Sequence, residues 1–315
     1  MAVTSDDSDE NALSAAITRR HFLRWLAGGV GVVVVAGAAG FELVNHDILP
    51  GKQLLDRIDG ACSVPATTFA FGTVGASESG RFYSQARRRS VGYTIAYPPS
   101  RQPGDSLPLV VMLHGYGGNH TNALFGISPA QALALQGKGA GLSPMAMVTV
   151  DGGDGYWNPH PGDDPMAMVV HELIPLCQRK GLGVAPMKIG LMGISMGGYG
   201  ALAIAERFPG LASAVAAISP AVWTSYGQAH SANAEAFASK SAFRAGDVIK
   251  HARALKGMAV RVAAGVDDPF QPGVESLARV LPAWSTVVFS AGCHTPSFFL
   301  EQEPPSLNYL SRHLL

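Results

Sequence analysis

A serine between glycines is the first residue of this chain that could carry out chemistry. Ser195 stands in the pattern Gly-x-Ser-x-Gly, after a short apolar run at 189–194 and before small residues that begin with Gly197. A serine in this context lies on a sharp turn from a strand to a helix, with its hydroxyl exposed above the sheet. The flanking glycines permit the turn because they carry no Cβ. The pattern predicts that Ser195 is a nucleophile.

The pattern is short, and a chain with 37 glycines can produce it by chance. The alternative interpretation is a glycine-rich turn in which Ser195 only caps the following helix. The residues around the pattern, and the presence of partners for the serine elsewhere in the chain, must decide between these two interpretations.

A serine hydroxyl is a weak nucleophile at neutral pH and needs a histidine base that a carboxylate orients. With this type of turn the chain order is serine, acid, histidine. Two later apolar runs end in such residues and in this order, the first at Asp267 and Asp268 and the second at His294. We predict that His294 is the base and Asp268 the acid, with Asp267 as the reserve. The other histidines after the serine are expected outside the site: His230, His251 and His313.

Acyl transfer also needs N–H groups aimed at the oxygen that becomes negative in the transition state. One donor is the amide after the nucleophile, and the other comes from the loop after an early strand. Here the apolar run 109–113 ends in His114-Gly115-Tyr116-Gly117-Gly118. We predict that Met196 and Tyr116 supply the two amides and that His114 is a structural hydrogen-bonding group. The alternative is that these glycines serve only to turn the chain.

These candidates require a sheet whose strand ends meet at one edge. Apolar runs alternate with helical stretches along the chain, which is typical of a mainly parallel, doubly wound α/β sheet with helices on both faces. An antiparallel hairpin is expected to open the fold, because its second segment alternates and is rich in β-branched and aromatic residues. The expected strands are 80–84, 90–98, 109–113, 146–150, 188–194, 214–220, 258–265 and 285–290.

Two helices are clear from local signals. One is predicted to begin with Asp164 as its N-cap and Pro165 in its first turn, and to stop at Gly181. The second follows Ser195 and runs through Glu206. The first helix places its apolar residues on one face at three- and four-residue spacing: Met166, Val169, Val170, Leu173, Ile174 and Cys177.

The loop after the strand at 146–150 is rich in acidic residues and lies at a strand end, where ligands gather in open α/β sheets. It carries Asp151, Asp154, His160, Asp163 and Asp164. Their spacing fits no standard metal site, and the last of them already has a role as a helix cap. We expect neither a metal nor a cofactor.

The start of the chain has a different character. Paired arginines, Arg19-Arg20, precede an apolar, glycine-rich run at 25–41, which is the signature of twin-arginine export. The run is shorter than the about 20 residues that a spanning helix needs. We predict recognition by the twin-arginine export machinery and a location outside the cytoplasm. The sequence leaves open whether the signal is cleaved, for which Ala36-Gly37-Ala38 offers a site, or is kept as a membrane contact through residues 22–44.

Bulk composition limits the partners. The chain has 23 acidic and 23 basic residues and no net charge, so no basic field indicates nucleic acid. Its apolar fraction of 47% fits a well-buried globular core. The three cysteines, Cys62, Cys177 and Cys293, allow one disulfide in an oxidising compartment. The sequence does not fix the pair, although Cys177 is expected to be a buried free thiol.

Together these motifs, from Phe82 to Leu310, resemble the esterase D-like family, which includes S-formylglutathione hydrolases and mycolyltransferase antigens. The motifs that carry the resemblance are Tyr93-Thr94-Ile95-Ala96-Tyr97-Pro98, His114-Gly115-Tyr116-Gly117, Gly193-Ile194-Ser195-Met196-Gly197-Gly198-Tyr199-Gly200-Ala201, Gly265-Val266-Asp267-Asp268-Pro269-Phe270 and Gly292-Cys293-His294. The resemblance implies the α/β-hydrolase fold and acyl-ester chemistry with Ser195, Asp268 and His294 as a triad. The chain departs from the mycolyltransferases, whose acid is a glutamate, and from the cytosolic formylglutathione hydrolases, since it carries an export signal.

The resulting organisation is a signal or anchor at 1–45, a linker at 46–68 and an α/β-hydrolase domain at 69–315. A small cap is expected at about 221–257, with a helical piece near 247–255. The predicted function is an exported serine esterase that acts on a small-molecule or lipid ester. One alternative is an acyltransferase that moves the acyl chain to a sugar or lipid alcohol. Another is a non-catalytic surface-binding protein on a hydrolase scaffold.

Overall fold

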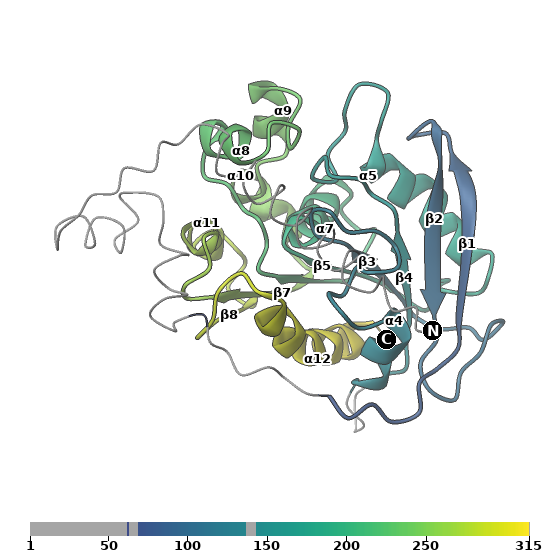
Figure 1. Cartoon of the computed structure of the whole chain (residues 1–315). Coiled ribbons are helices and arrows are strands. Elements are labelled where there is room, and N and C mark those ends of the chain that lie inside the picture. The colour runs from purple at the N-terminus through teal and green to yellow at the C-terminus, as the bar shows by residue number, and fades with distance from the viewer. Residues whose placement is uncertain (1–61, 63–68, 137–142, 315) are drawn as a thin grey trace, which may run out of the picture. The chain divides into compact units, whose positions relative to one another are not determined.

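The computed structural model describes residues 62, 69–136 and 143–314 of the chain (Figure 1). The predicted signal at 1–45 and all of the predicted linker except Cys62 lie outside the described residues. Within the described part, no helix combines the length and the apolar character needed to cross a membrane.

One eight-stranded sheet forms the centre of the molecule, in the order β1-β2-β4-β3-β5-β6-β7-β8. The pairs β1–β2 and β2–β4 are antiparallel, and every later pair is parallel. This mainly parallel arrangement confirms the predicted fold class. The strands are β1 Ser77–Ser84, β2 Arg89–Ala96, β3 Leu109–Leu113, β4 Ala146–Val150, β5 Ile189–Ile194, β6 Ala214–Ile218, β7 Ala259–Gly265 and β8 Thr286–Ser290.

The central strands β3, β5 and β6 are apolar throughout, and β4 is apolar except for Thr149, because both faces of the sheet are covered. In β3, Val111 belongs to one hydrophobic core and its neighbour Met112 to the core on the opposite face. The register holds Val111 beside Val148 of β4 and Leu191 of β5. For β3 and β4 the predicted ends agree with the structure.

Helices cover the two faces unequally (Figure 1). The core on one face includes residues of α5 (Pro165–Met168), α7 (Met196–Arg207) and α11 (Gln271–Ala278). The core on the other face includes residues of α4 (Pro129–Ala134) and of the long C-terminal helix α12 (Pro296–His313). Neither α4 nor α12 was expected from the sequence.

The segment predicted to form a cap, 221–257, contains more helix than expected. Its elements are α8 Tyr226–Ala232, α9 Lys240–Ala245, α10 Val248–His251 and the 3-10 turn η2 Ala252–Leu255. The last two match the helical piece expected near 247–255. The first two are short helices capped by serines, whose side chains accept a backbone hydrogen bond from the first turn.

The helix predicted after Asp164 runs without a break from Pro165 to Gln178, but it is not α-helical throughout. Asp164 caps α5 as predicted, by accepting a hydrogen bond from Ala167 N at 2.8 Å. A π-helical segment, η1 Val169–Leu173, then separates α5 from α6 (Ile174–Gln178). The cause is Pro175, which has no N–H to donate and whose ring would clash with the carbonyl four residues before it. The predicted helix is therefore present, with a π-helical turn inside it that the sequence signals did not show.

Candidate active site

Ser195 lies on the predicted turn between β5 and α7. Its backbone adopts φ 56° and ψ −120°, a conformation rare for a residue with a side chain. Hydrogen bonds from Ser195 N to Ile218 O (2.9 Å) and from Ala221 N to Ser195 O (3.0 Å) tie this turn to the end of β6. The neighbouring strand therefore holds the serine in its unusual conformation.

Two of the glycines in the motif are required by close backbone contacts. A Cβ on Gly197 would overlap the carbonyl of Leu113 at the end of β3, and a Cβ on Gly193 would overlap the carbonyl of Gly197. α7 consequently begins directly against the ends of β3 and β5. The structure thus shows the strand–turn–helix context on which the interpretation of Ser195 as a nucleophile depends.

Ser195, His294 and Asp268 form one chain of hydrogen bonds. The distance from Ser195 Oγ to His294 Nε2 is 2.8 Å, and that from His294 Nδ1 to Asp268 Oδ2 is 2.8 Å. Asp268 is only 3% exposed, and its second oxygen accepts a hydrogen bond from Phe270 N at 2.8 Å. Of the two candidate acids, Asp268 is the one that meets the histidine.

The hydrogen-bond chain fixes the tautomer of His294. A carboxylate can only accept, so the Nδ1 atom that faces Asp268 must carry the proton. Nε2 is then free to accept the hydrogen bond from the Ser195 hydroxyl. In this arrangement the imidazole can take the serine proton when the hydroxyl attacks an electrophile.

Aromatic rings surround the histidine. The ring of Phe270 lies edge-on to His294 with centroids 5.0 Å apart, and Phe299 does so at 4.9 Å. Trp223 packs against Phe270 at 4.8 Å, and Phe125 packs against Phe299 at 4.9 Å. No sequence pattern indicates a role for these four residues, because they come from separate elements and follow no common spacing. They give the surroundings of the imidazole an apolar, aromatic character.

The loop after β3 lies beside the serine turn. Gly115 packs against the carbonyl of Ile194, and the turn 115–118 is closed by a hydrogen bond from Gly118 N to Gly115 O at 3.0 Å. Among the described residues, no acceptor is found for the amide of Tyr116 or for that of Met196. Both amides stay predicted donors of the oxyanion hole.

His114 is fully buried, and backbone groups occupy both of its ring nitrogens. Nδ1 lies 2.7 Å from Gly115 O, and Nε2 lies 2.9 Å from Gly152 N. Burial lowers the pKa of His114, which favours the neutral ring that donates at Nδ1 and accepts at Nε2. This agrees with the structural role expected for His114.

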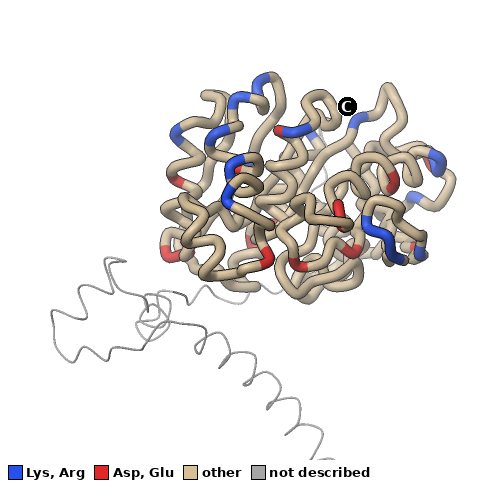
Figure 2. The backbone as a smooth tube through the Cα atoms, turned by 90° about the horizontal axis from the view of Figure 1, so that it is seen from above, with Lys and Arg blue, Asp and Glu red and all other residues tan. Residues whose placement is uncertain are grey.

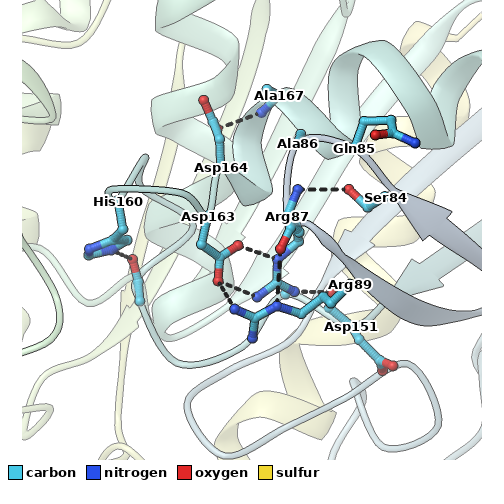
Figure 3. A network of polar contacts seen from close by, with 12 residues as sticks. Ser84, Gln85, Ala86, Arg87, Arg89, Asp151, His160, Asp163, Asp164 and Ala167 are labelled. Atoms are coloured by element: carbon cyan, nitrogen blue, oxygen red, sulfur yellow. Dashed lines mark hydrogen bonds and ion pairs between the residues drawn. The ribbon is translucent and has the colours of Figure 1, made fainter.

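The acidic loop after β4 is a framework of structural contacts. Asp163 makes two hydrogen bonds to the buried guanidinium of Arg87, at 2.7 and 3.0 Å, and an ion pair with Arg89 at 3.1 Å (Figure 3). Asp151 accepts from the amides of Gly92 and His120. These contacts fix the loop to the opening hairpin. Within the described residues, no group of three potential metal ligands is found.

Two of the three cysteines form a disulfide. Cys62 is bonded to Cys293, which directly precedes His294. Cys177 is a free thiol, as expected, and burial raises its pKa to about 12. The disulfide ties residue 62 of the predicted linker to the loop that carries the histidine.

The other three histidines after Ser195 have contacts outside the hydrogen-bond chain of Ser195, His294 and Asp268, as expected. His230 stacks on Tyr226 in the cap, and His251 lies 3.2 Å from the carbonyl of Arg244. His313 packs against Tyr309 at the end of α12. Charged positions are spread over several separate segments of the backbone (Figure 2).

The sequence model of the Esterase family, described as "Putative esterase", matches residues 84–278. The chain belongs to this family. It is thus an ester-hydrolysing serine hydrolase with the α/β-hydrolase fold, and a small-molecule ester is its substrate. No curated protein sequence matches the chain.

Solved structures of similar fold support the fold assignment of this esterase. A ferulic acid esterase superposes with a TM-score of 0.65 at 18% identity, covering 76% of this chain and 99% of the other. An S-formylglutathione hydrolase from Agrobacterium tumefaciens gives 0.59 at 17% identity, covering 79% and 98%. A fluorophosphonate-binding serine hydrolase of Staphylococcus aureus gives 0.60 at 14% identity, covering 76% and 99%.

Proposed function

We propose that this esterase is an exported enzyme that hydrolyses carboxylic esters through a Ser195–His294–Asp268 triad and an acyl-enzyme. The observation that carries the proposal is the continuous hydrogen-bond chain from Ser195 Oγ through His294 to the buried carboxylate of Asp268. It joins residues from the ends of β5, β7 and β8, the order in which the sequence places nucleophile, acid and base.

The geometry supports a two-step reaction. His294 Nε2 takes the proton of Ser195 as Oγ attacks the ester carbonyl carbon, and the amides of Tyr116 and Met196 donate to the resulting oxyanion. The imidazolium then gives its proton to the leaving alkoxide as the C–O bond breaks. Water, deprotonated by His294, attacks the acyl-enzyme and releases the acid and free Ser195. Asp268 stabilises the imidazolium in both steps.

Replacing Ser195 tests the mechanism. We expect Ser195→Ala to lower kcat for a p-nitrophenyl ester on the order of 10⁶-fold, because removal of the nucleophile removes the covalent route. Ser219→Ala is a matched control, since Ser219 is a buried serine at the end of the adjacent strand β6 and its hydroxyl has no partner within the described structure. An S195A enzyme as active as the S219A control would overturn the proposal.

Export is supported by two features. The sequence carries Arg19-Arg20 before an apolar run, and disulfides such as Cys62–Cys293 persist in oxidising compartments.

We expect the double variant Arg19→Lys, Arg20→Lys to accumulate in the cytoplasm, whereas Arg24→Lys, outside the pair, should be exported normally. Equal export of both variants would contradict the proposal. Alkaline extraction of the membrane fraction then separates a retained anchor at 22–44 from a cleaved signal.

A further inference from the structure

The turn that presents the Tyr116 amide receives little support from packing. Tyr116 is 61% exposed, and a Cβ built on Gly117 would meet no atom within 4 Å. Gly117 has φ +72°, a region that glycine enters freely. A turn of this kind can rotate its peptide units unless another part of the molecule holds them.

One side chain from a distant loop does hold the turn. Asp154 Oδ1 accepts a hydrogen bond from Gly117 N at 2.7 Å. Hydrogen bonds to ionised acceptors are shorter and about twice as strong as neutral ones. The backbone carbonyl of Asp154 accepts a second hydrogen bond from Asn233 Nδ2 in the cap, at 3.2 Å. Asp154 therefore connects the turn with the cap.

The loop that carries Asp154 is itself well fixed. Gly152 N donates to the ring of His114, and Trp157 Nε1 donates to the His114 carbonyl at 3.2 Å. Gly152 packs directly on the ring of Trp157, and His160 Nε2 lies 2.9 Å from Gly155 O. The Asp154 carboxylate thus projects from a rigid base that is joined to the same strand end as the turn.

We propose that Asp154 is a positioning residue of the oxyanion hole. Its carboxylate and the Gly118-to-Gly115 hydrogen bond together fix the peptide units on both sides of Tyr116, so that the Tyr116 N–H stays directed into the site. The inference rests on the proposed function, in which the Tyr116 amide binds the oxyanion. Asp154 acts through the backbone and makes no contact with the reacting atoms.

The negative charge of Asp154 provides a way to separate position from charge. A carboxylate near the oxyanion hole opposes the developing negative charge, so the charge is unfavourable for the reaction while the hydrogen bond is favourable. Asp154→Asn keeps an oxygen acceptor for Gly117 N and removes the charge. Asp154→Ala removes both.

Steady-state kinetics on a p-nitrophenyl ester, with the full chain, tests the proposal. Because a misplaced catalytic group can cost on the order of 10²-fold, we expect D154A to lower kcat and kcat/KM equally, by roughly 10- to 100-fold, with KM unchanged. D154N should keep at least the wild-type kcat. Asp105→Ala is the matched control. Asp105 also closes a turn, because it accepts a hydrogen bond from Gln102 N at 3.1 Å. It lies before the start of β3, whereas the Tyr116 turn follows the end of β3.

The possible results are distinct. If D154A has wild-type kcat, or if D105A and D154A lower kcat equally, the positioning role is overturned. If D154A does not fold, Asp154→Glu replaces it, since it keeps the charge but moves the acceptor. D154E slower than the wild type, which carries the same charge, supports the proposal, and equal rates overturn it. Failure of the proposed function is seen separately, because wild-type hydrolysis would then not depend on Ser195.

Discussion

The two amides that we propose for the oxyanion hole are held in different ways. Met196 N–H belongs to the turn at Ser195, where backbone contacts with the ends of β3 and β6 determine the conformation. Tyr116 N–H belongs to an exposed turn, and a side chain from the loop after β4 holds it. The first amide is positioned by the fold itself and the second by a contact between two loops.

This difference shows where mutations can act. The Ser195 side contains glycines for which no other residue fits, so changes there should remove the fold together with the activity. The turn at Tyr116 tolerates substitutions of its residues, but its conformation depends on a few polar contacts. A set of substitutions that separates stability from activity can break this comparison or make it sharper.

The largest effect is expected from a matched pair of glycine substitutions. In Gly197→Ala the new Cβ would overlap the Leu113 carbonyl, and because backbone cannot move aside, the expected loss of stability is about 3 kcal/mol or more, with loss of activity. In Gly117→Ala the Cβ enters open space, and only the positive φ costs about 1–2 kcal/mol. Chemical denaturation of both variants measures the difference.

If the two glycine variants lost equal stability, the distinction between a side fixed by the backbone and a side fixed by side chains would be wrong. The activity of Gly117→Ala adds a second check. This variant keeps the N–H that Asp154 binds, so its kcat should stay within a few-fold of the wild type.

A smaller loss of activity is expected from removal of the disulfide, which anchors the loop that carries His294. The Cys62–Cys293 disulfide joins residues that are 231 positions apart in the sequence, and Cys293 directly precedes His294. Its removal typically costs about 2–4 kcal/mol. We expect Cys62→Ser, Cys293→Ser to lower Tm and to reduce kcat partially. Cys177→Ser, at the buried free thiol, is the control for the cysteine change itself. Equal kcat in wild type and double variant would show that strand contacts alone position His294.

Replacing Glu206, near the C-terminal end of α7, is expected to change how stability depends on pH and to leave kcat unchanged. Burial, with a smaller contribution from Asp247, raises the pKa of Glu206 from 4.5 to about 9. Between these values the folded state binds more protons than the unfolded state, so stability is fully present below about pH 4.5 and falls as pH rises toward 9. Glu206→Gln cannot ionise and should remove this fall.

Melting temperatures at pH 5 and pH 8.5 check this prediction. Wild type and E206Q should melt at similar temperatures at pH 5, and E206Q should be the more stable at pH 8.5. Glu275→Gln, at a half-buried glutamate paired with Arg279, is the control. If E206Q and E275Q had the same effect at both values, ionisation of Glu206 would not limit stability.

The parts of the site that follow from local backbone geometry were predictable. Ser195 is recognisable because a strand, a tight turn and a closely packed helix require glycines at fixed distances. The strand that ends before Asp268 is recognisable because a buried parallel strand has a nearly continuous apolar sequence, and the strand before His294 is recognisable from its β-branched and aromatic residues. The residues that adjust the site were not predictable. Asp154 and Phe299 reach it only through tertiary contacts, and no pattern in the chain links them with Ser195.

Helix α12 shows the same limit in the fold. It includes Pro304 and Pro305, and a proline inside a helix costs about 3 kcal/mol. Local sequence therefore opposes the helix. It forms because Phe298, Phe299 and Leu307 are buried in the core on one face of the sheet. The free energy gained by packing the whole helix outweighs the cost of the two prolines. Local sequence signals do not contain this packing contribution.

The Cys62–Cys293 bond also determines where a shortened version of this protein can begin. A truncation at residue 69, where the predicted hydrolase domain starts, would remove Cys62 and leave Cys293 as an unpaired thiol next to His294, the proposed base. Such a protein could oxidise, or form dimers through that thiol. A recombinant chain that begins upstream of residue 62 keeps the crosslink.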